Sequence, residues 1–405
     1  MQFSGNNGAL KGKLVIDLSR VLGGPYCSQI LGDHGAEIVK IEPPRGDETR
    51  DWGPPFHESE GENSAAYFVG VNRNKRSMGL DLTKSEGREV LLRLLEKADV
   101  LLENYKPGTM EKWGLGYEDV LRHKFPQLVH CRVSGFGSDG PWGGFPGYDA
   151  IIQAMAGWFS INGEEGSAPT RLGLAGVDMG TGLYSAIAIL MALLERERSG
   201  QGQYLDMTLY DCAVSLMHPH IPNYNFSGDI PGPTGNAHPN ISPYDTFKTG
   251  TVDIFIGAGN NRAYTKLCVE IDREELIKDP RFLNNIDRVQ NRDELKQEIE
   301  ASLANMNGED LCNILARAGL AAGPIHNTQQ VVDHPHTHHR QMTIEKDWYK
   351  MTGTPIKLSR TPGSVRHLPP NFGQHSQELL KEFGFDSDEI QALLDAGAVL
   401  ENRQQ

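Results

Sequence analysis

The stretch RLGLAGVDMGTGLYSAIAILMALLERERSG, residues 171–200, is the segment around which the fold is expected to form. Its second half is rich in Ala, Leu, Ile and Met, which are strong helix formers or common core residues. This half is apolar almost all round, which is typical of a helix in the middle of a large fold. Arg196, Arg198 and then Gly200 mark the expected end of the helix.

A single carboxylate, Asp178, lies at the start of this helix among small residues. Gly176, Gly180 and Gly182 leave the backbone open to a ligand, and a helix N-terminus offers free N–H groups and favours an anion. Asp178 is therefore either a cap of the helix or a nucleophile whose oxyanion is held by neighbouring amides. From these residues alone capping is the favoured interpretation, because caps are far commoner than catalytic aspartates.

Composition indicates an ordinary globular protein large enough for two or three domains, with 405 residues of which 38% are hydrophobic and 23% charged. Acidic residues exceed basic ones by 53 to 39, for a net charge of −14, which argues against a general nucleic-acid binder. The five cysteines are scattered without a CxxC spacing, as in proteins of a reducing compartment. With no signal-peptide pattern and no apolar run of 18 residues, we expect a cytoplasmic protein without a membrane partner.

Strands and helices are expected to alternate in the first 135 residues. Apolar runs predict strands at 14–18, 37–41, 99–103 and 127–134, and helices at 25–32, 86–97 and 118–124. Such βαβ units imply a parallel sheet. The turns at 19–25 and 104–108 follow strands, and open α/β sheets bind ligands at the carboxyl ends of their strands.

Three further segments of this part are expected to be loops. Residues 43–63 are polar, and residues 71–77 carry three cations in four positions. This cluster is suited to phosphates, although a solvated loop is the slightly favoured interpretation. The run GFGSDG at 135–140 matches the dinucleotide fingerprint, but Pro141 forbids the helix that must follow, so we expect a mobile glycine loop.

The pattern changes at residue 218, where prolines and histidines predict a linker over 218–243. We expect a large domain over 1–217, a small domain over 244–327 and a return to the large domain over 328–405. Strands in the small domain are predicted at 244–248, 252–258 and 321–325, with helices at 261–270, 292–303 and 308–318. His334, His336, His338 and His339 lack acidic or cysteine partners at ligand spacing, so they are read as surface residues and no metal site is predicted.

Seven motifs occur in an order and spacing that resembles class III CoA-transferases, the group of formyl-CoA and carnitine CoA-transferases. They are residues 17–25, 39–42, 72–77, 103–108, 147–149, 176–178 and 235–239. The resemblance covers essentially the whole chain and is strongest to members that use succinyl-CoA and dicarboxylic acids. It implies an α/β fold with a Rossmann-like large domain from both chain ends, a smaller α+β domain, and an interlocked homodimer.

By this resemblance Asp178 is the nucleophile, which reverses the preference for a cap. Its carboxylate would attack an acyl-CoA thioester to give a mixed anhydride, and CoA would return to give an aspartyl-CoA thioester. Tyr148 and Asp149 match an aromatic–acid pair close to the nucleophile. CoA is then a substrate together with a small carboxylic acid, and no permanently bound cofactor is expected.

The resemblance also implies which residues contact CoA. Pro43 replaces a basic residue that some members use, and Lys112 stands where the family often has Arg. The expected contacts are Val21, Leu22, Asn72, Asn74, Lys75, Arg76, Asn104, Tyr105, Lys106 and Lys112.

This sequence differs from the motifs of related enzyme groups at several positions, and these differences limit the reactions that it is expected to catalyse. Racemases of the superfamily carry a His–Asp pair where this chain has Tyr148–Asp149, so one of two bases is missing and a racemase ranks below a transferase. Formyl-CoA transferases carry a longer glycine run than residues 257–262. Arg262 or Arg171 is a candidate partner for a distal carboxylate, and a non-catalytic CoA-binding protein is the third alternative. The expected substrate loop contains Gly257, Gly259, Asn260 and Arg262.

Overall fold

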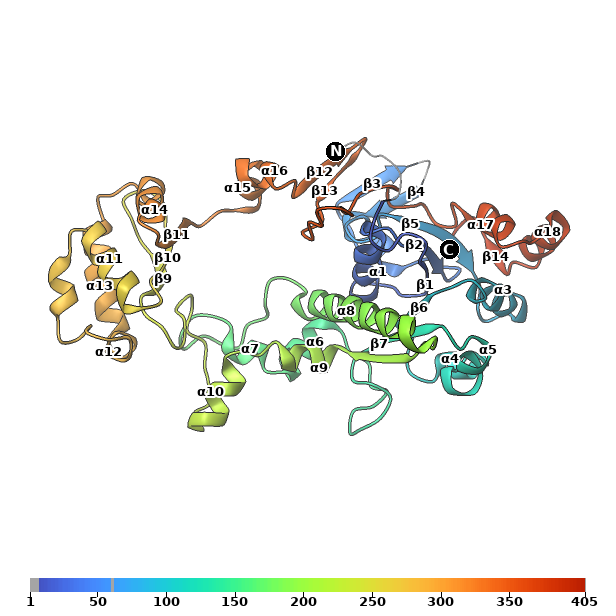
Figure 1. Ribbon diagram of the computed structural model, residues 1–405, viewed down its shortest axis with the longest axis horizontal. Coiled ribbons are helices and arrows are strands. Elements are labelled where there is room, and N and C mark those ends of the chain that lie inside the picture. Colours follow the sequence, from blue (N-terminus) through green and yellow to red (C-terminus); the bar gives the residue numbers. More distant parts are fainter. Residues whose placement is uncertain (1–6, 60–61, 405) are drawn as a thin grey trace. The chain divides into compact units, whose positions relative to one another are not determined.

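The computed structural model describes residues 7–59 and 62–404, which form two compact units (Figure 1). Unit 1 comprises Met1–Ala156, Leu172–Ile221 and Gln341–Gln405, so both ends of the chain build it. Unit 2 comprises Gly157–Arg171 and Pro222–Arg340. Residues 157–171 thus group with unit 2, although the sequence-based division placed them in the first domain.

A seven-stranded sheet forms the centre of unit 1, in the order β14-β5-β2-β1-β6-β7-β8. All neighbours are parallel except β14, which pairs antiparallel with β5. In chain order the six parallel strands lie 3-2-1-4-5-6, which is the doubly wound arrangement, and the order reverses between β1 and β6. The strands are β1 Leu14–Asp17, β2 Glu37–Glu42, β5 Lys75–Leu80, β6 Val100–Glu103, β7 Val129–Ser134, β8 Tyr204–Thr208 and β14 Val399–Leu400.

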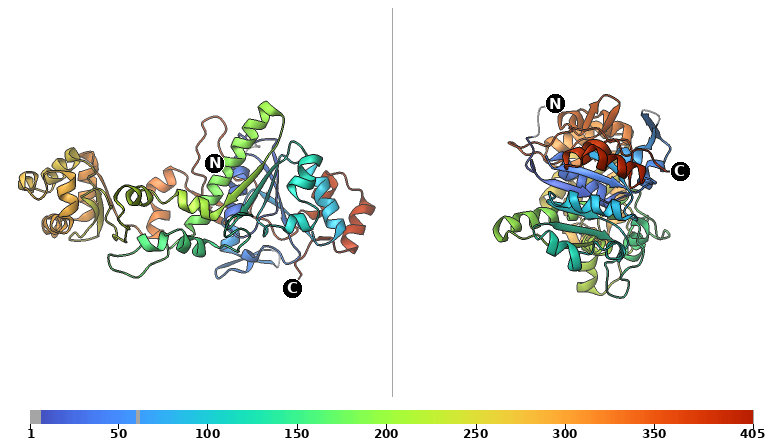
Figure 2. Two further views of the ribbon diagram at one scale, coloured as in Figure 1. Left: turned by 90° about the horizontal axis from the view of Figure 1, so that it is seen from below. Right: turned by 90° about the vertical axis from the view of Figure 1, so that its right-hand side faces the viewer.

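Helices cover both faces of this sheet (Figure 2). Alternate side chains of β1 separate the faces: Ile16 packs in a core with α3 Ser85–Leu95, α17 Ser376–Glu382 and α18 Ser387–Asp395. Asp17 points the other way and accepts a hydrogen bond from Ser28 Oγ of α1 Gly23–Asp33. Helix α8, Gly176–Ser199, packs beside α1. The predicted α/β fold with a parallel sheet is therefore confirmed.

Helix α8 is the apolar helix expected from the opening stretch, and it ends at Gly200 with φ of 73°. With 24 residues and a mean hydropathy of 1.7 over 18 of them, it is long and apolar enough to cross a membrane. Half of this window is buried within the protein, as in the core helix of a domain.

Two of the expected loops contain regular structure. Residues 71–74 form a turn, as expected, but 75–77 belong to strand β5, whose Lys75 pairs with Ile38 and whose Arg76 pairs with Val39 in β2. Most of the segment is buried, so the interpretation as a solvated loop was wrong. The segment 43–63 contains a 3₁₀ helix at Glu48–Asp51, β3 at Phe56–Ser59 and the start of β4 at Glu62–Ala65. The remaining elements of unit 1 are α2 Ala66–Val69, α4 Thr109–Lys112, a π-helix at Tyr117–Leu121, α5 Arg122–Lys124, α6 Asp149–Met155, α9 Leu209–Ser215, β12 Thr343–Lys346 and β13 Tyr349–Thr352.

Unit 2 has an antiparallel sheet in the order β11-β10-β9 with helices around its own core. Asn260 and Asn307 cap α11 and α14 through their side-chain oxygens, which explains why these helices begin where the sequence predicted. The expected linker contains α10, and the four histidines at 334–339 are exposed as expected. The elements are α7 Trp158–Ile161, α10 His220–Ser227, β9 Tyr244–Phe247, β10 Ile254–Gly257, α11 Asn261–Glu270, a 3₁₀ helix at Glu274–Lys278, α12 Asn285–Gln290, α13 Arg292–Leu303, α14 Gly308–Arg317, β11 Ala321–Pro324, α15 Thr328–Asp333 and α16 Pro335–His339.

Candidate active site

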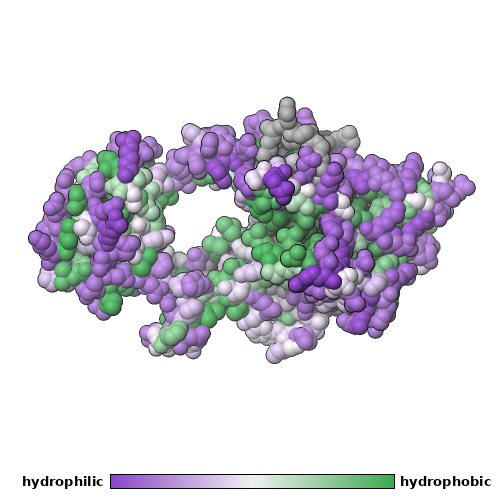
Figure 3. Space-filling view, viewed as in Figure 1, coloured by the Kyte–Doolittle hydropathy of each residue, from purple (hydrophilic) through white to green (hydrophobic). Residues whose placement is uncertain are grey.

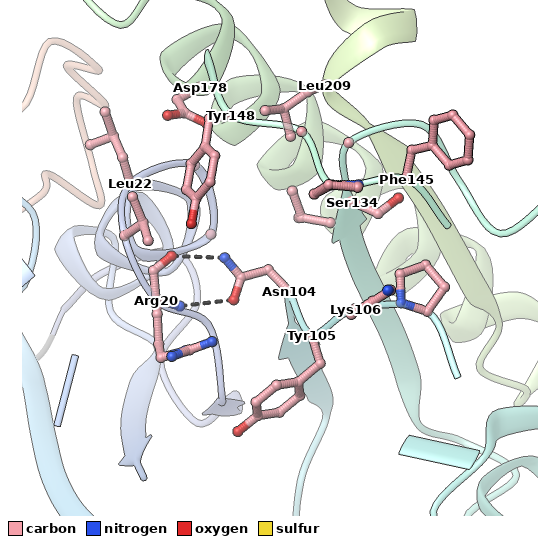
Figure 4. A pocket seen from close by; sticks show the side chains of 18 of the residues that line it. Arg20, Leu22, Asn104, Tyr105, Lys106, Ser134, Phe145, Tyr148, Asp178 and Leu209 are labelled. Carbon is pink, nitrogen blue, oxygen red and sulfur yellow. Dashed lines mark hydrogen bonds between the residues drawn. The ribbon is translucent and has the colours of Figure 1, made fainter. Parts of the chain in front are cut away.

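A pocket of about 230 Å³ opens in unit 1 beside the point where the strand order reverses. The turns that follow β1, β6 and β7 form its walls, and Asp178 at the start of α8 lies at one end (Figure 4). Ligands of doubly wound sheets bind at this place, outside the carboxyl ends of the strands. The lining residues are Arg20 to Gly24, Glu48, Asn104 to Pro107, Val133 to Gly135, Phe145 to Tyr148, Asp178 and Leu209.

Asp178 is the third residue of α8, and its backbone and side chain lie against α1. A Cβ atom added to Gly23 would lie 3.3 Å from the Asp178 carbonyl oxygen and 3.6 Å from Oδ1. Burial and, secondarily, the negative charge of Asp149 raise the pKa of the Asp178 carboxyl to about 7. Asp178 therefore gives up its proton within the physiological pH range.

Asp149, rather than Asp178, caps helix α8. Its Oδ2 accepts hydrogen bonds from the backbone N–H groups of Val177 at 2.8 Å and Asp178 at 3.1 Å. The N-cap residue itself, Ala175, makes no side-chain cap. The Asp149 carboxylate is oriented in turn by Gln153, whose Nε2 donates to Oδ1 at 2.5 Å. Because a different residue satisfies the helix start, the carboxylate of Asp178 remains available in the pocket.

Three backbone N–H groups at the start of α1 also belong to this pocket. Leu22 is the N-cap of α1 and makes no side-chain cap, and the next two residues are Gly23 and Gly24. Among the residues that the structure describes, none accepts a hydrogen bond from the N–H of Leu22, Gly23 or Gly24. Free amides at a helix N-terminus stabilise negative charge, so they are suited to an oxyanion formed at Asp178.

Tyr148 and the predicted glycine loop form the outer part of the pocket. Tyr148 is 62% exposed, and Figure 4 shows its ring beside Leu22 and Asp178. Phe145, Pro146 and Gly147, from the loop that follows GFGSDG, line the same wall. No helix follows that motif directly, as the argument from Pro141 required.

The predicted CoA residues after β6 reach the pocket, with one exception. Asn104, Tyr105 and Lys106 line it, and the Asn104 amide bonds the backbone of Arg20 in the opposite wall. Lys112 is exposed at the end of α4 and does not line the pocket. Burial raises the pKa of the Tyr105 hydroxyl far above its usual range, so this group stays protonated.

The side chains predicted for the nucleotide end of CoA are bonded within the protein. Lys75 Nζ donates to Asp17 Oδ2 at 3.2 Å and to Asn72 Oδ1 at 2.9 Å, and burial lowers the pKa of Lys75 to about 8. Asn74 Nδ2 donates to Asp33 Oδ1 at 2.8 Å, and Arg76 pairs with two glutamates of α17. A role for these side chains in CoA binding stays a prediction, and it requires them to leave their present partners.

The predicted substrate loop belongs to unit 2, at the turn between β10 and α11. Gly257 ends β10, and Asn260 caps α11 by accepting from Ala263 N at 2.9 Å. Arg262 is exposed, and so is Arg171, which also belongs to unit 2. Within the described residues no group of three His, Cys, Asp or Glu side chains is arranged to hold a metal ion.

Sequence reasoning missed several residues that line the pocket, notably Arg20, Glu48 and Ser134. Arg20 and Ser134 lie at or just after the ends of strands, so the rule that ligands bind beyond strand carboxyl ends would have found them. Glu48 had no such signal, because its place depends on the 3₁₀ helix within a segment expected to be a loop.

Comparison with known proteins agrees with this architecture. The sequence model of CoA-transferase family III matches residues 10–376. The succinate–glutarate CoA-transferase of Agrobacterium fabrum is 40% identical over 92% of this chain and 95% of its own length. The succinyl-CoA:mesaconate CoA-transferase of Haloarcula hispanica is 39% identical over 93% and 97%. The crystal structure of a CAIB/BAIF family protein from Brucella suis superposes with a TM-score of 0.84 at 41% identity, covering 93% of this chain and 100% of that one.

Proposed function

The chain belongs to CoA-transferase family III, and we propose that it moves CoA from succinyl-CoA to a dicarboxylic acid through covalent intermediates on Asp178. The observation that carries the proposal is the Asp178 carboxylate, left free by the Asp149 cap and placed beside the α1 amides that have no acceptor among the described residues. Relatives named for succinyl-CoA or succinate at about 40% identity support the donor.

The first half-reaction has two steps, and each step forms one bond and breaks another. An Asp178 carboxylate oxygen attacks the thioester carbonyl carbon, the C–S bond breaks, and CoA leaves as a thiolate. The thiolate then attacks the Asp178 carbonyl carbon of the mixed anhydride and releases succinate, which leaves an aspartyl-CoA thioester. The acceptor carboxylate repeats the two steps in reverse order, and no proton is transferred at any stage.

Each tetrahedral intermediate carries a negative oxygen that needs donors. The N–H groups of Leu22, Gly23 and Gly24 are candidates, because they line the pocket without acceptors among the described residues and stand at the positive end of α1. Loss of one such donor typically costs about 10²–10³-fold in rate. Lys106 adds positive charge along the same walls, suited to the diphosphate of CoA, whereas Arg20 is paired there with Glu48 at 3.1 Å.

The acceptor is expected to be a dicarboxylate whose distal carboxylate binds an arginine. Arg262 and Arg171 are both exposed and accessible to it. Replacing each by Glu should raise the KM for the acceptor at least tenfold at one of the two positions. An unchanged acceptor KM in both variants would exclude this part of the proposal.

A homodimer is part of the proposal, because α8 presents an apolar stripe on its outer side. Figure 3 shows hydrophobic residues gathered over this helix. Leu183, Ile187, Leu190, Met191 and Leu194 follow helical spacing and are 42–69% exposed. A second copy of the chain would cover them. Sedimentation should give a dimer that M191E/L194E dissociates and Arg198→Glu, beyond the stripe, leaves intact.

Intact-mass spectrometry tests the central claim. Mixing the protein with succinyl-CoA should give a CoA adduct, which peptide mapping places on Asp178 and which a suitable acid removes. The isosteric variant Asp178→Asn should bind CoA but form no adduct. No adduct in the wild-type protein, or an adduct elsewhere, would overturn the proposed mechanism.

A further inference from the structure

The turn between β1 and α1 has a strained backbone at Val21. Its φ is +71°, in the left-handed region that β-branched residues strongly avoid. Val21 immediately precedes Leu22, Gly23 and Gly24, which line the pocket that contains Asp178. A conformation of this kind persists only where the surroundings impose it. The question is therefore which groups hold this turn.

Asn104 holds the turn from the side of β6. Its Oδ1 accepts from Arg20 N at 2.9 Å, and its Nδ2 donates to Arg20 O at 2.8 Å, as the dashed lines in Figure 4 show. The Arg20 carbonyl oxygen belongs to the peptide group that joins Arg20 to Val21. Both polar groups of the amide are thus bonded to the residue before the strained one.

A second set of contacts holds the turn from the side of β2. Asp47 Oδ1 accepts from Val21 N at 3.3 Å. Lys40 Nζ donates to Ser19 O at 2.9 Å and to Asp47 Oδ2 at 3.0 Å. Lys40 and Asp47 are both fully buried, so removing either leaves a buried charge without its partner. Asn104 is half-buried and neutral, which makes it the contact that can be changed without that penalty.

We propose that Asn104 is a positioning residue, which holds Val21 in its strained conformation and so keeps the backbone of Leu22 and Gly23 in its place in the pocket beside Asp178. This inference rests on the proposed transferase function, and it differs from a direct contact between Asn104 and CoA. An amide is the side chain that offers a donor and an acceptor at this spacing. Aspartate in its place keeps the acceptor but turns a second oxygen toward Arg20 O.

The proposal predicts that loss of the Asn104 amide changes the rate of adduct formation but not the affinity for free CoA. Without the amide, Val21 is free to relax to an ordinary φ, and the N–H groups move away from the developing oxyanion. Free CoA carries no such oxyanion, so its binding changes little. The rate of adduct formation at saturating succinyl-CoA therefore falls, whereas the Kd of free CoA is nearly unchanged.

The strain itself provides a rescue experiment. Glycine adopts a φ of +71° without a steric penalty. In the Val21→Gly variant the turn therefore no longer needs the hydrogen bonds of Asn104 to hold a strained residue. If Asn104 acts through Val21, the loss caused by Asn104→Ala is smaller when residue 21 is glycine. Two independent roles would instead give losses that multiply.

The experiment begins with wild-type protein and succinyl-CoA, because absence of an adduct there would overturn the transferase proposal before any variant is considered. Single-turnover rates and Kd values for free CoA are then measured for N104A, V21G and the double variant. We expect N104A to slow adduct formation at least tenfold with a Kd within threefold of wild type. The double variant should recover most of that loss of rate.

Three outcomes would overturn the role of Asn104. The first is a Kd raised tenfold with an unchanged rate at saturation, which would mark Asn104 as a direct CoA ligand. The second is an unchanged rate and an unchanged Kd. The third is a pair of losses that multiply in the double variant. If N104A does not fold, N104D is measured with and without V21G, with the same expected rescue.

Discussion

The carboxylate of Asp149 accepts a hydrogen bond from the backbone N–H of Asp178 at 3.1 Å, while its charge raises the pKa of the Asp178 carboxyl. One aspartate thus both fixes the start of the helix and opposes ionisation of the other. These two effects can be separated by substitution, because the first needs an acceptor oxygen and the second needs a charge.

Asp149→Asn tests the charge, and Asp149→Ala tests the charge and the cap together. Asparagine keeps an oxygen for Val177 N and Asp178 N but loses the acceptor for Gln153 Nε2, so Asp149→Asn should cost less unfolding free energy than Asp149→Ala, which loses the cap as well. Both variants should lower the pH at which adduct formation is half-maximal, because the like charge is gone. The cap that Asp149→Ala removes and Asp149→Asn retains should account for about 1 kcal/mol of unfolding free energy between the two variants. Equal pH midpoints in wild type and D149N would contradict the electrostatic argument.

The pH dependence of the wild-type reaction follows from the raised pKa. The ionised carboxylate is the proposed nucleophile, so kcat/KM for adduct formation should rise with pH and reach half its maximum near the pKa of about 7. The measurement is a single-turnover rate at limiting succinyl-CoA from below to above this pKa. A rate that is constant over this range would mean that Asp178 ionises at its ordinary pKa.

Asp178→Asn should stabilise the protein at high pH while abolishing the adduct. A carboxyl whose pKa is higher in the folded than in the unfolded state loses stability as pH rises from about 4 to about 7, because the unfolded chain releases the proton first. Asparagine has no such cost, so we expect a gain on the order of 2 kcal/mol at about pH 8.

Denaturant unfolding at about pH 4.5 and about pH 8 measures this difference. At the lower pH the Asp178 carboxyl is protonated in the folded protein, so most of the gain from asparagine should disappear. A gain of the same size at both pH values would point to a packing effect instead of ionisation.

The parts of the fold that the sequence predicted are those set by local pattern. Strands β1, β2 and β6 are short segments rich in Val, Ile and Leu, and the helices capped by Asn260 and Asn307 begin next to a side chain that fixes them. Helix α8 was predicted from its composition alone. The position of Asp178 at its start follows from the same pattern, and so does a pocket beyond the strand ends.

The parts that the sequence did not predict depend on partners far along the chain. Lys75 and Arg76 make β5 look like a solvated loop, yet Asp17 and Glu382 neutralise them from positions 58 and 306 residues away. The cap of α8 comes from Asp149, which lies 28 residues before Val177. No short-range pattern contains such pairings, so the choice between cap and nucleophile for Asp178 could not be made from local residues.

The last prediction follows from the close approach of α1 and α8. A Cβ atom at Gly182 would lie 2.7 Å from the Gly23 carbonyl oxygen, closer than a side chain tolerates, and 3.0 Å from the Tyr26 ring. Gly182→Ala should therefore push α8 away from α1, cost about 1–3 kcal/mol of unfolding free energy, and slow adduct formation because Asp178 moves with its helix. Gly232→Ala is the matched control, because a Cβ there meets nothing within 4 Å, and it should leave both quantities unchanged. If Gly182→Ala were as stable and as active as this control, the contact between the helices would not position the nucleophile.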